Sequence, residues 1–172
     1  MALLFFILLV KRFTDILDSA TRNREGGEKV DKKVILVSHG KLSEGMAHST
    51  QMICGENEDL SYYGMMPGEH YTAIVEAIKE KASANPDTQY IVIADLLGGS
   101  VCNGCTELIG MENVKLISGM NMGLVIDLLF AAAPVSDEDI EESLRACKET
   151  IANVTPKYIK SKEPDGDAND FF

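Results

Sequence analysis

The sequence predicts an α/β domain, built on a doubly wound and mostly parallel sheet with helices on both faces. The first observation is a set of short apolar runs closed by turn residues, a pattern typical of strands buried on both faces. The second is that segments with helical spacing of apolar residues lie between these runs, and this alternation favours βαβ crossovers. The third is the length of 172 residues, without a repeat or a second block of composition, which suits one domain with a complete core.

Four parallel strands are expected, and the clearest are the continuous apolar runs Val34 to Val37 and Tyr90 to Ala94. The expected bounds are Lys33 to Ser38, Asp59 to Tyr63, Tyr90 to Ala94 and Val114 to Ile117. A last short strand is expected at Lys157 to Ile159.

Five helices are expected between and after these strands, because apolar residues recur there at the spacing of one helical face. Their expected positions and apolar stripes are Lys41 to Ile53 with Leu42, Met46 and Ile53; about Glu69 to Ser83 with Tyr71, Ile74, Val75, Ile78 and Ala82; a helix that opens at Gly98-Gly99-Ser100; one with Leu124, Val125, Leu128, Leu129 and Ala132; and one with Ile140, Leu144, Cys147 and Ile151. Ser136 is the expected N-cap of the last helix.

The chain divides into an N-terminal extension and linker (residues 1–32), a domain (33–160) and an acidic tail (161–172) whose composition predicts disorder. The run from Met1 to Val10 is apolar and is followed by Lys11-Arg12. It is too short to span a bilayer as a helix and lacks the features of a signal peptide. An amphipathic helix from Leu3 to about Leu17, packed on the domain or on a partner, is favoured over sequence added in cloning, an upstream start, or a membrane anchor.

The net charge of −11 argues against nucleic acid or an anionic membrane surface as the main partner. The four cysteines are spread through the predicted core elements, which predicts reduced thiols in a cytoplasmic protein. Cys102-Asn103-Gly104-Cys105 matches the C-x-x-C pattern, so a thiol redox protein stays open as a different class of function. No metal site is expected, because no second ligand pair has suitable spacing.

Two strand ends carry reactive side chains. His39 follows the first strand and Asp95 the third, and in doubly wound sheets ligands bind at the carboxyl ends of such strands. A carboxylate beside an imidazole can fix its tautomer and leave Nε2 as the nucleophile. Gly98-Gly99-Ser100 offers backbone amides that suit a phosphate. Together these residues suggest phosphoryl transfer through a phosphohistidine, although His39 alone could be structural, Asp95 a helix cap, and the glycine turn lacks the lysine of a P-loop.

From Lys33 to about Ile151 the chain resembles the IIA component of the mannose-class sugar phosphotransferase system (mannose, fructose, sorbose and N-acetylgalactosamine). The matching segments, in family order and spacing, are Val34 to Gly40; Pro67-Gly68-Glu69; Asp95 to Ser100 with Asn103; and Gly119-Met120-Asn121. Two positions depart from the family pattern, since Val101 stands where proline is usual and Cys102 where an aromatic residue often follows. These departures concern the shape of the loop more than the reaction.

The resemblance implies a phosphotransferase whose His39 accepts a phosphoryl group from the phosphocarrier HPr on Nε2 and passes it to a IIB component on a separate chain. The membrane components IIC and IID then import the sugar, which IIA never contacts. Asp95 would orient the imidazole, and no cofactor is needed. The resemblance further implies a cytoplasmic homodimer, peripheral to the membrane through the transporter complex, that exchanges the C-terminal strand at Lys157 to Ile159.

Related domains relay phosphoryl groups to dihydroxyacetone kinase or sense phosphorylation in regulators, and these roles remain alternatives. The pattern from Asp95 to Ser100 favours sugar import. His48 and His70 are expected at the surface or in a cap, although His70 could lie at the edge of the site through the Pro67 loop. Met65-Met66 is expected to pack that loop or to offer an adaptable apolar surface to a partner.

Overall fold

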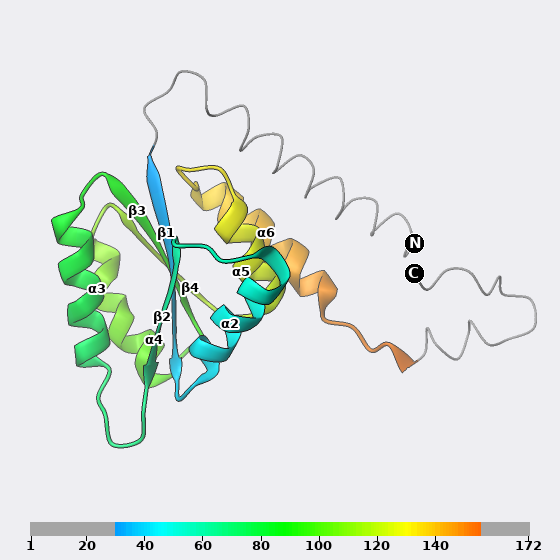
Figure 1. The fold of residues 1–172 in the computed structure, drawn as a ribbon, viewed down its shortest axis with the longest axis horizontal. Helices are drawn as coiled ribbons and strands as arrows, with labels where there is room; N and C mark the ends of the chain where they lie inside the picture. The colour runs from blue at the N-terminus through cyan, green and yellow to red at the C-terminus, as the bar shows by residue number, and fades with distance from the viewer. Residues whose placement is uncertain (1–29, 156–172) are drawn as a thin grey trace, which may run out of the picture.

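The computed structural model describes residues 30–155, and its centre is a four-stranded parallel sheet in the order β2-β1-β3-β4. The strands are β1 (Asp31–His39), β2 (Leu60–Met65), β3 (Thr88–Ala94) and β4 (Val114–Ser118). The helices are α2 (Leu42–Cys54), α3 (Thr72–Ala84), α4 (Ser100–Cys105), the 3-10 helix η1 (Thr106–Gly110), α5 (Met122–Phe130) and α6 (Asp137–Thr150). The predicted α/β class is therefore confirmed (Figure 1).

Three sequence predictions concern segments outside the described residues: the helix from Leu3 to Leu17, the strand from Lys157 to Ile159 and the acidic tail. Within residues 30–155, no helix combines the length and apolar character needed to cross a membrane.

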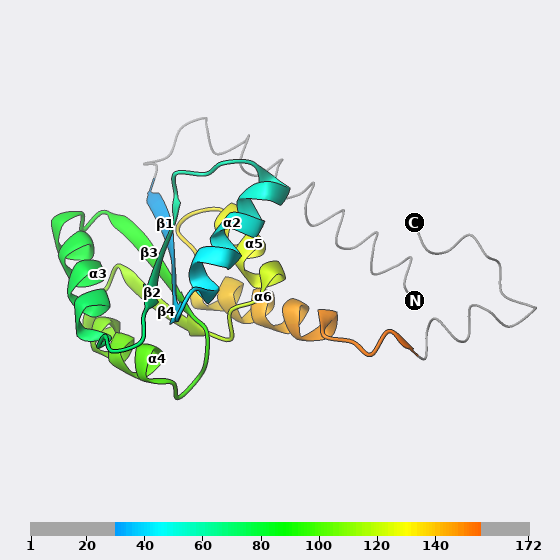
Figure 2. The same ribbon diagram turned by 60° about the horizontal axis from the view of Figure 1, so that its bottom comes forward.

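The sheet separates two apolar cores because successive side chains of a strand point to opposite faces. On β1, Val34 and Leu36 pack with residues of α2, α5 and α6, whereas Ile35 and Val37 pack with residues of α3, α4 and η1. Figure 2 shows these two groups of helices on opposite sides of the sheet. All four β1 residues are at most 1% exposed, which explains the continuous apolar run in the sequence.

The two central strands send the chain to opposite faces of the sheet. β1 leads into α2 on one face, and β3 leads into α4 on the other. Neighbouring strands whose connections diverge in this way leave a crevice at their carboxyl ends, the usual ligand site of such sheets. This topology brings His39 and Asp95 to one place.

The apolar stripe predicted for α2 does not form the main contact of this helix with the core, although Met46 packs against it. Ser43, Ala47 and Thr50 face the core, whereas Leu42 and Ile53 are exposed. Small residues face the sheet here because the Ser43 backbone amide donates to Ser38 Oγ at 2.8 Å and the Ser43 hydroxyl donates to the Tyr63 carbonyl at 2.8 Å. These bonds hold the start of α2 close against β1 and β2, where a large side chain would not fit.

Two smaller expectations at helix ends are also corrected. Ala132 lies beyond the end of α5, and Ile151 follows α6 and is exposed. The predicted cap of α6 is confirmed: Ser136 Oγ accepts from the Asp139 amide, and the Asp139 carboxylate accepts from the Ser136 amide. This reciprocal pair is a capping box.

Lys32 on β1 is buried, and its ammonium donates to the carbonyls of Leu128 and Ala131 at 2.6 and 2.5 Å, at the end of α5. Burial lowers the pKa of Lys32 from 10.5 to about 8, against the opposing effect of Asp59 and Asp127. Between pH 8 and 10.5 the unfolded chain therefore binds more protons at this residue than the folded chain does. The contribution of Lys32 to stability accordingly rises with pH across that window.

We expect the free energy of unfolding of the wild type, minus that of Lys32→Met, to rise by up to about 3 kcal/mol between pH 8 and 10.5, since one pKa unit corresponds to about 1.4 kcal/mol. Urea unfolding of both proteins at several pH values across this range measures the difference between their free energies of unfolding. The difference between the two proteins is needed because burial raises the pKa of Cys105 to about 11, which lowers stability in both as pH rises above 9. A difference that does not change with pH would contradict the prediction.

Candidate active site

His39 and Asp95 lie side by side at the carboxyl ends of β1 and β3. Asp95 Oδ2 lies 2.8 Å from His39 Nδ1 and also accepts the His39 backbone amide at 2.8 Å. Asp95 Oδ1 accepts the Leu96 amide at 2.8 Å. The Asp95 side chain is only 8% exposed, and that of His39 is 41% exposed. The carboxylate is thus fixed and largely shielded, while the imidazole remains open to a partner.

The other imidazole nitrogen faces Ser100, with His39 Nε2 lying 3.0 Å from Ser100 Oγ. When Nδ1 carries the proton and donates it to Asp95, Nε2 has a free lone pair and the serine hydroxyl is the donor. The order Asp95, His39, Ser100 is also that of a hydrolase triad, in which serine would be the nucleophile. Two reactions therefore fit these contacts: attack by Nε2 and attack by Oγ.

A tight turn brings Ser100 to the imidazole. The Gly99 amide donates to the Leu96 carbonyl at 3.1 Å, and Gly98 has φ +81°, the left-handed value that glycine adopts most readily at this turn position. The Asn103 side-chain amide donates to the Gly98 carbonyl at 3.0 Å. The peptide group between Gly98 and Gly99 is therefore fixed by two hydrogen bonds, one from its amide and one to its carbonyl.

Gly99 is the point of closest approach between this turn and the imidazole. A Cβ at Gly99 would lie 2.9 Å from His39 Cε1 and 3.2 Å from the Leu96 carbonyl oxygen. Only glycine lets the backbone pass this close to the ring. All five residues predicted for the site, His39, Asp95, Gly98, Gly99 and Ser100, are thus brought together.

Comparison with known proteins shows which family this chain resembles. The family model EIIA-man, described as PTS system fructose IIA component, matches residues 33–155. The chain belongs to the EIIA-man family. This places it among the EIIA components of the sugar phosphotransferase system, in the mannose class that the sequence resembles.

Named EIIA-man relatives include the sorbose-specific EIIA component of Klebsiella pneumoniae, 28% identical over 65% of this chain and 83% of the relative. The mannose-specific EIIAB component of Escherichia coli K12 is 22% identical over 76% of this chain. This chain spans 42% of the length of that relative. A solved K. pneumoniae structure, described as a sugar phosphotransferase system permease, is 30% identical with a TM-score of 0.68, and the match covers 77% of this chain and 98% of the other.

The C-x-x-C pattern has a structural explanation in this EIIA-man domain. Cys102 and Cys105 are 4% and 0% exposed, and burial, with a further contribution from Cys102, raises the pKa of Cys105 to about 11. Reactive thiols need access and a lowered pKa, so these features argue against the redox alternative. Within residues 30–155, no cluster of three or more histidine, cysteine or acidic side chains could hold a metal ion.

Two contacts near the site were not predicted from sequence. The ring of Tyr71 packs directly on Gly104, where any Cβ would overlap it, so the residue before α3 is tied to α4. A Cβ at Gly64 would likewise overlap the Gly40 carbonyl oxygen, which lets β2 lie against the turn after His39. Neither contact can be predicted from neighbouring residues, because the atom that requires each glycine belongs to a residue far away in the sequence.

His70 is exposed, as expected. Its Nδ1 pairs with Thr72 Oγ1 at 2.6 Å at the start of α3, although the N-cap residue Tyr71 makes no side-chain capping hydrogen bond. His48 is exposed on α2. In the Met65-Met66 pair, Met65 packs against the core formed with α3 and α4, while Met66 is 37% exposed.

Proposed function

We propose that the domain is a cytoplasmic phosphocarrier in which His39 accepts a phosphoryl group from HPr on Nε2 and passes it to a IIB component. The observation that carries this proposal is the pairing of Nδ1 with the shielded Asp95, which leaves the lone pair on Nε2, the nitrogen that faces Ser100. Family membership favours histidine over serine as the nucleophile. Sugar import would then follow through the membrane components IIC and IID.

In the proposed reaction, the Nε2 lone pair attacks phosphorus as the bond from phosphorus to the histidine of HPr breaks. The proton on Nδ1 stays on the ring, where Asp95 stabilises the positive charge that develops. The Ser100 hydroxyl turns from Nε2 to a phosphoryl oxygen, and the backbone amides of Gly98 and Ser100 complete the phosphate site. The Gly99 amide, which was also expected to hold the phosphate, donates instead to the Leu96 carbonyl. The donor is already an activated phosphohistidine, so no nucleotide or metal takes part in the proposed step.

Incorporation of label from radioactive phosphoenolpyruvate, with enzyme I and HPr added, tests the proposal. We expect acid-labile, base-stable label on the wild type and none on His39→Ala. His48→Ala and His70→Ala are matched controls and should label normally. Ser100→Ala should still be labelled, about tenfold more slowly, because one hydrogen bond is lost. Label on folded His39→Ala, or none on folded wild type, would overturn the proposal, and loss of all label in Ser100→Ala would indicate a serine nucleophile.

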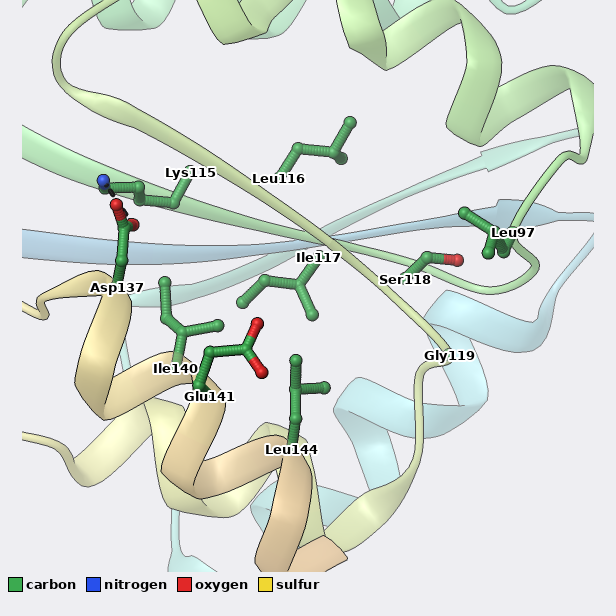
Figure 3. Close-up of a pocket in the computed structure, with 10 residues that line it drawn as sticks. All are labelled: Leu97, Lys115, Leu116, Ile117, Ser118, Gly119, Asp137, Ile140, Glu141 and Leu144. Atoms are coloured by element: carbon green, nitrogen blue, oxygen red, sulfur yellow. Dashed lines mark hydrogen bonds and ion pairs between the residues drawn. The ribbon is translucent and has the colours of Figure 1, made fainter. Parts of the chain in front are cut away.

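We also propose a homodimer in which Lys157 to Ile159 of one copy pair with β4 of the other. β4 is hydrogen-bonded to β3 alone among the described strands, so its second edge is open. A groove of about 420 Å³ runs between that edge and α6. Figure 3 shows Ile117, Ile140 and Leu144 pointing into the groove. A strand added at this edge would satisfy the β4 backbone.

Sedimentation equilibrium of two shortened chains tests the dimer. Removing residues 156–172 deletes the expected strand and should give a mass near that of one chain, whereas the full protein should give twice its chain mass of 18.8 kDa. Removing only residues 163–172 leaves the strand and should leave the dimer. A dimer that survives the longer deletion would contradict strand exchange.

A further inference from the structure

One side of α2 carries large apolar side chains that the described domain does not cover. Leu42 and Ile53 are 50% and 65% exposed, and Met52 beside Ile53 is 76% exposed. Leu42, Met46 and Ile53 recur at helical spacing, so they form one stripe. Met46 is partly buried against the core. Exposed apolar side chains on one side of a surface helix are typical of a contact site.

The stripe continues toward α5. The Thr50 hydroxyl lies 3.3 Å from Met122 Sδ, which places Met122 on the side of α5 that meets α2. Ile126 follows one turn later on the same side, and both residues are only partly buried. The apolar face, defined as Leu42, Met46, Ile53, Met122 and Ile126, therefore spans two neighbouring helices.

The N-terminal segment joins the domain next to this face. The Val34 amide donates to the Asp59 carbonyl at 2.7 Å, and Lys33 pairs with the Asp59 carboxylate at 2.6 Å. Asp59 is at the end of the short loop that follows α2. The start of β1 therefore lies beside the end of the loop that joins α2 to β2, so the chain enters the domain next to this loop.

The segment outside the described residues has the composition and length to cover the apolar face. Met1 to Val10 is almost wholly apolar and is followed by Lys11-Arg12, while the loop after α2 exposes Glu56 and Glu58. Residues 18–29 can reach about 40 Å when extended, whereas α2 is about 20 Å long. The basic pair and the acidic loop are complementary in charge.

We propose that residues 1–17 pack on the apolar face, with Lys11-Arg12 beside the loop of Glu56 and Glu58. A segment of the same chain is favoured over a separate partner because tethering gives it a high effective concentration. It is favoured over a lipid surface because the acidic loop and the net charge of −11 repel anionic headgroups. This proposal is independent of the reaction at His39, and its test uses no phosphoryl transfer.

A double-mutant cycle in the full-length chain tests the packing. One change is Ile53→Asp, and the other is the pair Phe5→Asp and Leu8→Asp. We expect each change alone to lower the urea midpoint of unfolding by about 0.5 M and the combination to lower it no further, because both remove one contact. Ile109→Asp, at an exposed site on η1, is the control and should combine additively with the N-terminal pair.

Three outcomes would overturn the proposal. Additive effects of Ile53→Asp and the N-terminal pair would mean that the two sites do not touch. A change in sedimentation mass on Ile53→Asp alone would assign the apolar face to a second copy. Co-sedimentation of the wild type, but not of the N-terminal variant, with phosphatidylcholine–phosphatidylglycerol vesicles, together with additive effects, would assign Met1 to Val10 to a lipid surface.

Discussion

Replacing Asp95 with asparagine is expected to slow phosphoryl transfer to His39 by a factor on the order of 10³ while leaving the fold intact. Asp95 Oδ2 accepts both the His39 backbone amide and Nδ1–H, and Oδ1 accepts the Leu96 amide. An asparagine has one oxygen for these positions. If its NH₂ group faces the ring, it donates to Nδ1 and moves the ring proton to Nε2, where it blocks the nucleophile. The same change of tautomer costs about 10⁴-fold in a serine protease triad.

Rapid-quench measurement of label transfer from phosphorylated HPr checks this prediction, with circular dichroism as the test of folding. Asp87→Asn is a suitable control, because Asp87 is an exposed carboxylate in the turn before β3. A rate for Asp95→Asn within a few-fold of the wild type would show that the carboxylate does not set the tautomer.

Gly99→Ala is expected to slow phosphoryl transfer to His39 on the order of 10²-fold through a steric effect alone. The new Cβ would lie 2.9 Å from His39 Cε1 and 3.2 Å from the Leu96 carbonyl oxygen. Neither neighbour can yield freely, since Asp95 holds the ring and the Gly99 amide holds the Leu96 carbonyl. The imidazole must therefore tilt, and a displacement of about 1 Å at a reacting group costs about 10²-fold.

The matched control is Gly110→Ala, at a glycine whose Cβ would meet no atom within 4 Å. That variant should transfer phosphate at the wild-type rate. The displaced ring in Gly99→Ala should also appear as a shift of the His39 imidazole resonances, while the backbone spectrum away from the turn stays the same. Normal transfer by Gly99→Ala would mean that the turn can move away from the ring at little cost.

The strands could be predicted because each is marked by a run of neighbouring residues in the sequence. The approach of His39 to Asp95 could be predicted for the same reason. Val34 to Val37 and Tyr90 to Ala94 are continuous apolar runs, and each is followed within two residues by a reactive side chain. The rules of parallel sheets then bring the two ends together. Several strand ends lie one or two residues beyond the predicted bounds, because backbone pairing in a sheet extends past the apolar part of a strand, whereas β2 begins one residue later than predicted, at Leu60.

The buried face of α2 could not be predicted from apolar periodicity. Its core contacts are made by Ser43, Ala47 and Thr50, because close packing and hydrogen bonds to β1 and β2 require small residues there. The apolar stripe that the periodicity found is real, but it lies on the flank of the helix. The role of Gly104 was hidden for a similar reason, since the ring that requires it belongs to Tyr71, far away in the sequence.

Phosphorus–nitrogen NMR of the ¹⁵N-histidine-labelled protein, after phosphorylation by HPr, tests whether Nε2 of His39 is the phosphoryl acceptor. We expect one phosphoramidate whose phosphorus couples to Nε2 of His39, with Nδ1 still protonated beside Asp95. Coupling to Nδ1, or a phosphate on Ser100 or on another histidine, would contradict it.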